Sequence, residues 1–338
     1  MRVRLRDLAE GLGLSVMAVS KALRDAPDIG VATKARVLAE AAKQGYWPNE
    51  AARSLRVKQS GLVGLLLPDL ASEEGAMVSG SLAEAAQEAG IALLVGVARS
   101  GKEEAEQVRA MMGRGAEAIF FLPRISTEHR SAVLEVVGRA GLPLIFFKRY
   151  PADVDGGKGK VSWVVRDMGG AANLVLDHLH DLGHRKVAYL GGHPAARSSA
   201  AHLRGMEEGV AARGMVMLGG VQMVGLEAAG GEAEMKKMLG KKERPTAVVC
   251  INDAIAAGAS RALLAAGVSV GGEVSVTGVG DGALACYGPV PMTTVCFPSL
   301  GRVGFSLWQK VREGKGEMKP EIVKGELVVR ASTGKVGE

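Results

Sequence analysis

The chain has 338 residues, 47% of them hydrophobic, and a formal net charge of +6. It is long enough to bury a large interior and long for a single core. No apolar run reaches the roughly 18 residues of a membrane span, and residues 1–20 form an arginine-bearing amphipathic pattern, not a secretory signal. The three cysteines show no Cys-x-x-Cys spacing, which argues against a zinc site or a disulfide framework. We therefore expect a cytoplasmic protein with a small module and a larger body.

Residues 5–25, LRDLAEGLGLSVMAVSKALRD, predict two helices separated by a glycine turn. Four apolar residues at three- and four-residue spacing give the first helix one apolar stripe: Leu5, Leu8, Ala9 and Leu12. We expect Gly13 to end this helix, because glycine enters the left-handed C-cap without strain. Ser15 is expected to cap the second helix by accepting a hydrogen bond from an amide of its first turn.

The second helix is expected to be anchored by one edge and free on the other. Its inward residues would be Ala18, Val19 and Leu23, and its outward residues would be Val16, Met17, Ser20, Lys21 and Arg24. A recognition helix needs such a free face to enter a major groove. Val16 and Met17 can contact a thymine methyl but cannot form bidentate hydrogen bonds, so specificity would lean on Lys21, Arg24 and groove shape. An ordinary amphipathic helical hairpin is the alternative.

This stretch and the following KARVLAEAAKQGYWPNEAARSLRVKQS resemble the N-terminal DNA-binding domain of the LacI/GalR family of bacterial transcription regulators. The resemblance implies an all-α helix-turn-helix domain, lambda-repressor-like, over residues 1–48. A third helix over residues 33–44 would close a small three-helix core, and Pro48 would prevent its continuation. Arg4 stands where relatives often carry a threonine cap, so we expect the first helix to begin differently.

Residues 49–60 resemble the hinge helix of the same family, which folds on the operator and pushes a leucine into the minor groove. Leu55 occupies that position, and an apolar wedge of this kind bends the duplex at the cost of base unstacking. Asn49, Arg53 and Arg56 are the further DNA contacts that the resemblance implies here. The alternative is that Leu55 packs within a linker helix.

Charge is concentrated at the amino-terminal end. Residues 1–60 hold eleven Lys or Arg and six Asp or Glu, so +5 of the formal +6 lies there and the remaining chain is nearly neutral. A basic surface confined to one end is expected where that end meets phosphate. A basic solvated face without a partner is the alternative.

Residues 61–338 alternate short apolar strands with amphipathic helices, a pattern that favours parallel sheets covered on both faces. Two such halves predict an α/β, two-lobed body of the periplasmic-binding-protein-like type that the resemblance also implies, with a ligand cleft between the lobes. We expect the first lobe to contain residues 61–158 and 290–318. The second lobe would contain residues 159–289 and 319–338.

Several strings of the body resemble family landmarks: HLHDLGHRKVAYLGG, INDAIAAGASRALLAAGV, VSVTGVGDGA and PMTTVCFPSLGRVG. In the third of these, Gly278, Gly280 and Gly282 could pass for part of a dinucleotide fingerprint. That fingerprint should open a helix in a first βα unit, whereas Pro289 and Pro291 follow here. Nucleotide binding is therefore disfavoured, and we expect no cofactor.

The predicted effector pocket departs from the family pattern. The HLRGM string puts His202 where relatives carry a sugar-gripping arginine, with Arg204 two residues on, and Lys148 stands where they commonly carry Asp. Asp253, Asp281 and Ser198 are the other predicted contacts. A cation in place of an acceptor suggests an effector with an anionic group, such as a sugar acid or a sugar phosphate. The alternative is that Lys148 pairs with Asp281 or points to solvent.

These parts predict a homodimeric repressor that reads a palindromic operator and responds allosterically to a sugar or sugar derivative. The sequence does not indicate whether the ligand releases or strengthens DNA binding. A solute-binding sensor would share the two-lobed body but not residues 1–60. An α/β enzyme would need a phosphate loop or a catalytic cluster, and the sequence shows no catalytic or metal-ligating pattern.

Overall fold

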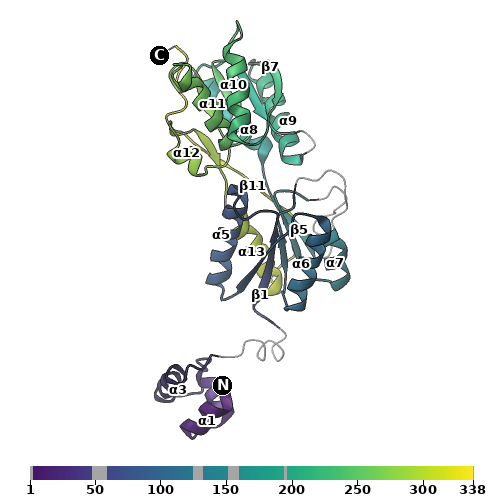
Figure 1. The fold of residues 1–338 in the computed structure, drawn as a ribbon, viewed down its shortest axis with the longest axis vertical. Helices are drawn as coiled ribbons and strands as arrows, with labels where there is room; N and C mark the ends of the chain where they lie inside the picture. The colour runs from purple at the N-terminus through teal and green to yellow at the C-terminus, as the bar shows by residue number, and fades with distance from the viewer. Residues whose placement is uncertain (1–2, 48–58, 125–131, 151–159, 194–195, 338) are drawn as a thin grey trace. The chain divides into compact units, whose positions relative to one another are not determined.

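The structure is a computed structural model that describes residues 3–47, 59–124, 132–150, 160–193 and 196–337. Two compact units make up the chain, Met1–Ser60 and Gly61–Glu338 (Figure 1). The predicted hinge contacts Asn49, Arg53, Leu55 and Arg56 lie outside the described residues. No described helix combines the length and apolar character needed to cross a membrane.

Three helices form the smaller unit: α1 Leu5–Leu12, α2 Val16–Ala22 and α3 Val31–Lys43. Their apolar faces enclose a core that includes Leu8, Val19 and Val37, each fully buried. The cap position of helix α1 is an arginine, which has no hydroxyl to cap it. The Arg4 amide instead donates a hydrogen bond to the Asp7 carboxylate at 2.8 Å. Helix α3 starts two residues before the predicted position.

A six-stranded sheet organises the first lobe of the larger unit, and all its described pairings are parallel. Its order is β11 Glu321–Val323, β5 Val161–Arg166, β4 Leu144–Phe147, β3 Ile119–Phe121, β1 Leu62–Leu67 and β2 Ala92–Val97. Side chains on strands alternate between faces. Phe120 therefore packs with α5 Glu73–Glu88 and α13 Leu300–Arg312, while Phe121 packs with α6 Gly101–Gly113 and α7 Ala132–Ala140.

A four-stranded parallel sheet organises the second lobe, in the order β7 Val216–Met223, β6 Lys186–Gly191, β8 Ala247–Cys250 and β9 Ser275–Thr277. The helices of this lobe are α8 Met168–Asp181, α9 Arg197–Ala212, α10 Ala228–Leu239, α11 Asp253–Ala265 and α12 Ala283–Tyr287. A short antiparallel pair, β10 Thr294–Cys296 with β12 Glu326–Val328, joins this lobe through a bridge between Thr293 and Thr277.

The predicted lobe boundaries differ from the sheets in three places. Strand β5 was expected in the second lobe, yet it pairs with β4 in the first, with Leu144 opposite Val161. Strand β11 also joins the first sheet, whereas β10, expected in the first lobe, lies beside the second. Strand pairing decides lobe membership, and the chain first crosses between lobes after Arg166.

Two glycines let helices α10 and α11 pack closely. A Cβ on Gly258 would overlap the carbonyl oxygen of Ala228 and lie 2.7 Å from its carbonyl carbon. A Cβ on Gly231 would likewise meet the backbone of Ile255. Because the opposing atoms are backbone, a side chain at either position forces the helices apart.

We expect Gly258→Ala to lower the free energy of unfolding by roughly 2 kcal/mol, the range of overpacking in a close-packed core. Gly138→Ala in α7 is the matched control, because its added Cβ would meet no atom within 4 Å and alanine favours helix. Urea unfolding of both variants measures the difference. Equal stabilities would contradict the close-packing interpretation.

Candidate DNA-reading face and ligand cleft

Helix α2 presents an exposed apolar pair above a buried anchor. The Ser15 hydroxyl accepts a hydrogen bond from the Ala18 amide at 3.1 Å, as predicted, and so fixes the start of the helix. Val19 and Ala22 are buried, whereas the predicted inward residues Ala18 and Leu23 are only half-buried. Val16 and Met17 are 45% and 67% exposed, an arrangement that leaves both available to a partner.

The cations of α2 and the following turn make surface contacts that a DNA phosphate can replace. Lys21 pairs with the exposed Asp28, whose pKa is lowered mainly by that hydrogen bond. Arg24 is exposed and donates through Nε to the Ser20 carbonyl oxygen at 3.0 Å. Exposed ion pairs contribute little stability, so a DNA phosphate can take over Lys21 at small cost.

The second candidate site lies where the carboxyl ends of strands from both lobes come together. From the first lobe come Lys148 after β4, Arg166 at the end of β5, and the start of α5. From the second lobe come Asp253, the first residue of α11, and the loop after β9. The Glu73 carboxylate from the first lobe and the Asp253 carboxylate from the second both pack against the loop after β9, at Gly282 and Gly278 respectively, so charged groups of the two lobes meet at one site.

Lys148 contacts Glu74, not Asp281. The Glu74 carboxylate pairs with Lys148 and, at 3.4 Å, with Arg149. Burial disfavours the Glu74 charge, yet the two cations outweigh it and hold the pKa of Glu74 below its usual range. Burial lowers the pKa of Lys148. The alternative of a Lys148–Asp281 pair is therefore wrong.

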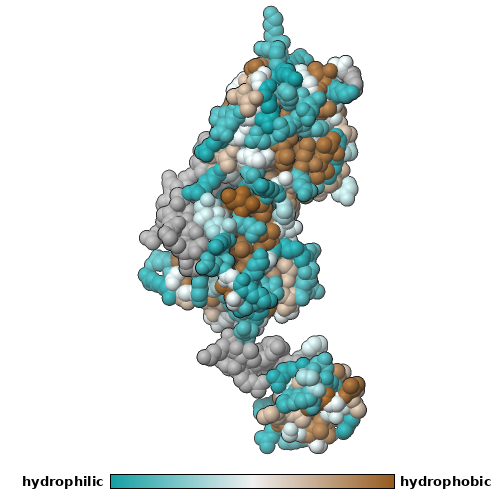
Figure 2. Space-filling view, turned by 180° about the vertical axis from the view of Figure 1, so that it is seen from behind, coloured by the Kyte–Doolittle hydropathy of each residue, from teal (hydrophilic) through white to brown (hydrophobic). Residues whose placement is uncertain are grey.

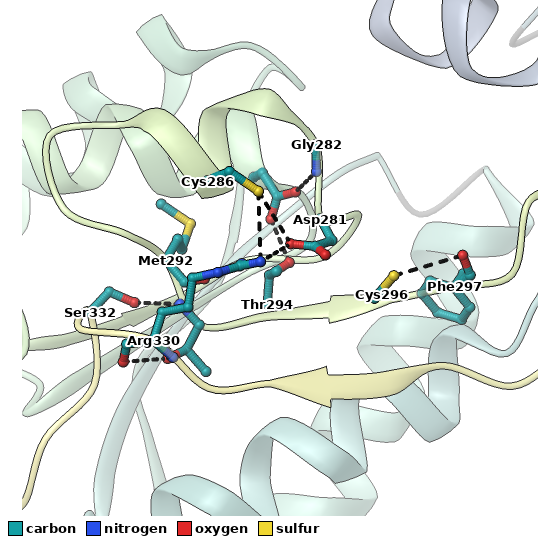
Figure 3. Close-up of polar contacts among 11 residues, drawn as sticks. Asp281, Gly282, Cys286, Met292, Thr294, Cys296, Phe297, Arg330 and Ser332 are labelled. Carbon is teal, nitrogen blue, oxygen red and sulfur yellow. Dashed lines mark hydrogen bonds and ion pairs between the residues drawn. The ribbon is translucent and has the colours of Figure 1, made fainter. Parts of the chain in front are cut away.

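Both predicted carboxylates of the second lobe already have protein partners. The buried Asp253 accepts hydrogen bonds from the Thr294 hydroxyl at 2.6 Å and from the Gly282 amide at 3.1 Å. Asp281 pairs with Arg330 at 2.7 Å (Figure 3). Burial raises the pKa of Asp253. Asp253 therefore ties β8, β9 and the crossover strand β10 to one another.

The GVGDGA glycines are explained by these carboxylates and not by a nucleotide. A Cβ on Gly278 would overlap the Asp253 carboxylate, and a Cβ on Gly282 would overlap that of Glu73 from the other lobe. Gly280 has a φ of 139°, which other residues rarely adopt. Close approach of carboxylates to this loop therefore requires glycine.

His202 does not supply a positive charge to the cleft, which corrects the sequence prediction. Its ring is fully buried, stacks on Tyr189 with centroids 5.4 Å apart, and shares a hydrogen bond of 3.1 Å between Nδ1 and the Tyr189 hydroxyl. Burial lowers the pKa of His202 to about 4, so the ring is neutral at pH 7. Arg204 is exposed, and Ser198 is half-buried in the first turn of α9.

Comparisons with known proteins cover almost the whole chain. A family model described as a periplasmic binding protein-like domain matches residues 176–333. The HTH-type transcriptional regulator AglR of Rhizobium meliloti (strain 1021) is 30% identical over 99% of this chain and 95% of its own length. The chain belongs to the LacI/GalR family of transcriptional regulators. The lactose operon repressor of Escherichia coli (strain K12) is 26% identical over 98% of this chain and 91% of its own length.

Solved structures confirm the predicted fold of this LacI/GalR regulator. The lac repressor dimer bound to operator and the anti-inducer ONPF superposes with a TM-score of 0.82, covering 99% of this chain and 100% of that one at 22% identity. The CelR–cellobiose complex gives a TM-score of 0.69, covering 98% and 100% at 24% identity. Both the helical module and the two-lobed body are therefore as expected.

Sequence reasoning missed several charged residues of this regulator's candidate effector site. Glu73, Glu74, Arg149, Arg166 and Arg330 were not predicted there, although Arg166 ends a recognisable apolar strand. The rule that ligand sites gather at the carboxyl ends of parallel strands could have identified it. Arg330 had no such signal, because it reaches Asp281 from the far end of the chain. Among the described residues, no three His, Cys, Asp or Glu side chains are grouped to hold a metal ion.

The buried His202 predicts a loss of stability in acid. Its pKa is about 4 in the folded chain against 6.5 ordinarily, so the unfolded state binds more protons between these values. Its contribution to the free energy of unfolding is intact above pH 6.5 and falls by about 3 kcal/mol towards pH 4.

We expect His202→Gln to remove this part of the pH dependence, as measured by urea unfolding between pH 7 and pH 4. Burial also lowers the pKa of His184, which titrates in both proteins, so the difference between the two curves isolates His202. Parallel curves would show that His202 is not a buried neutral ring.

Proposed function

We propose that this chain is a transcriptional repressor that binds a palindromic operator as a homodimer and changes its DNA affinity when a small sugar-derived effector enters the cleft. The exposed apolar pair on the capped helix α2, in a unit separate from the two-lobed body, is the observation that carries the proposal. In this proposal the relatives' operator and sugar complexes are examples of the same division of labour.

The proposed DNA contacts come from two segments. Helix α2 would enter the major groove with Met17 towards a base edge, while Lys21 and Arg24 neutralise phosphate or reach bases. The proposed contacts are Ser15, Val16, Met17, Ser20, Lys21 and Arg24 on this helix, and Asn49, Arg53, Leu55 and Arg56 in the hinge. Backbone contacts set affinity, and the few base contacts set sequence preference.

Pairing of two chains is proposed through the larger unit. Hydrophobic residues form patches on the face of this unit that Figure 2 shows. Exposed hydrophobic side chains occur on one edge strand of each sheet, Val95 and Val97 on β2 and Val216 and Met223 on β7. Apolar edge strands favour association, and a dimer would present two reading helices to successive major grooves.

The cleft is proposed as the effector site, with Lys148, Ser198, Asp253 and Asp281 among its contacts. A ligand that binds one lobe arrangement better shifts the population towards it and so changes the geometry of the paired DNA-binding units. We propose a purely regulatory protein without catalysis or cofactor, working in the cytoplasm where the DNA lies. A solute-binding sensor would not need the DNA-reading unit.

Selection from a randomised duplex library tests the proposal. We expect the full chain to select an inverted repeat with half-sites about one helical turn apart. The double variant Lys21→Ala, Arg24→Ala should weaken binding to that duplex. The slope of the binding constant against salt concentration, on logarithmic axes, should fall by up to about two, which corresponds to about two lost phosphate contacts. Lys43→Ala, at the end of α3, is the control. Recovery of no inverted repeat would sink the proposed function.

Met17 is expected to contribute to base preference. Met17→Gln introduces an amide that can pair with adenine in the major groove, so the preferred base at one half-site position should change in the same selection. Met17→Leu, still apolar, should keep the original preference. An unchanged sequence preference for Met17→Gln would exclude Met17 as a base-contacting residue.

A further inference from the structure

We propose that Arg166 is the anion-binding residue of the cleft, and that the effector is a hydroxylated compound carrying a carboxylate or phosphate group. This inference rests on the proposed function of the cleft as the effector site. It names the chemical class of the effector and assigns the anion contact, which the sequence predicted for Lys148 with His202 or Arg204, to a residue that the sequence did not indicate.

Arg166 is positioned where a ligand between the lobes would meet it. It ends β5, and the chain crosses from there into the second lobe through Asp167, the cap of α8. Its guanidinium carbon lies 5.2 Å from the centre of the Phe297 ring, on a second segment that joins the lobes. The ring supports one face of the guanidinium, as cation–π packing does, and leaves the in-plane N–H groups for an acceptor.

The donors of Arg166 are unused within the part of the chain that the structure describes. Its Nε is buried and has no hydrogen-bond partner there, and its guanidinium forms no ion pair with a described carboxylate. Burial, the largest influence, lowers the pKa of Arg166. A buried cation without a hydrogen-bonded partner is costly, and a bound carboxylate or phosphate would satisfy it with two parallel hydrogen bonds.

The neighbouring cations are already paired. Lys148 and Arg149 share the Glu74 carboxylate, and Arg330 holds Asp281. Arg166 therefore differs from each of them in having no short-range anionic partner among the described residues. An incoming anion would have to displace a paired carboxylate at those three cations, whereas the carboxylates near Arg166 act on it only electrostatically.

A carboxylate near Arg166 limits what kind of anion fits. Glu73 is exposed, has no hydrogen-bond partner among the described residues, and interacts electrostatically with Arg166 and Asp253. A carboxylate accepts hydrogen bonds from hydroxyls and repels a second anion. An acceptor near a guanidinium without a hydrogen-bonded partner therefore matches a molecule with one anionic end and a hydroxylated remainder, such as a sugar acid or a sugar phosphate.

Calorimetric titration of the full chain tests the inference with D-glucuronate, D-gluconate, D-glucose 6-phosphate and neutral D-glucose. We expect at least one of the three anions to bind more tightly than glucose, and the preference between carboxylates and phosphate distinguishes the two anionic groups. Arg166→Gln should weaken that anion by about 10- to 100-fold, the range for hydrogen bonds to charged groups. Arg166→Lys, which keeps the charge but loses the planar fork, should lie between.

Arg185→Gln is the matched control, because Arg185 is exposed at the amino end of β6, where its side chain donates to the carbonyl oxygens of His180 and His184 and forms no ion pair with a described carboxylate. It should leave anion binding unchanged. Thermal unfolding of ligand-free Arg166→Gln reports any purely structural role, and Arg166→Lys keeps the test decisive if the Gln variant does not fold. Glucose binding as tight as the anions, no anion binding to the natural chain, or equal anion affinity in the natural chain and the Arg166 variants would overturn the inference.

The same preparations separate this inference from the proposed function. Binding of the selected operator duplex is measured by fluorescence anisotropy without ligand, where neither Arg166 nor the anion takes part. If the natural chain binds the operator duplex but shows no anion binding that depends on Arg166, the inference is refuted and the proposed function is not. Anion binding that depends on Arg166, in a chain that recognises no duplex, refutes the repressor and leaves the anion site standing.

Discussion

The buried carboxylate of Asp253 is the contact on which the geometry of the cleft depends. It accepts hydrogen bonds from the Gly282 amide and the Thr294 hydroxyl, and so joins the ends of β8 and β9 to the crossover strand β10. A buried carboxylate is tolerated only when its oxygens are satisfied. The glycines of the β9 loop follow from the same contact, since side chains there would overlap the carboxylate.

Some charged side chains of the candidate effector site are ion-paired within the protein, and one is not. Glu74 with Lys148 and Arg149, and Asp281 with Arg330, are compensated within the protein. Arg166 lies beside the Phe297 ring, and its Nε has no hydrogen-bond partner among the described residues, while Glu74 and Asp253 act on it only electrostatically. The ion-paired side chains hold the site in shape. A buried polar group without a hydrogen-bond partner can be stabilised by a ligand that supplies one. The chemical character of the effector would thus be set by one residue more than by the total charge.

The DNA-reading unit follows a different design. Its core is small, its helix α2 is short, and the proposed contacts Val16, Met17 and Arg24 are exposed. Loose surface pairs such as Lys21 with Asp28 cost little to exchange. Little free energy is therefore lost when Lys21 leaves Asp28, so most of the free energy of a new contact between Lys21 and the duplex contributes to DNA binding.

The sequence by itself determined the features that depend on local pattern. Helical spacing, Gly13 and Ser15 predicted the helix-turn-helix, and apolar strands between amphipathic helices predicted the two-lobed body, because both signals lie within a few turns or strands. Only the tertiary structure decided which charges meet. His202 is a buried neutral ring hydrogen-bonded to Tyr189, Lys148 pairs with Glu74, and β5 belongs to the first sheet. These outcomes depend on burial and on partners distant in the chain, and neither is encoded in the spacing of neighbouring residues.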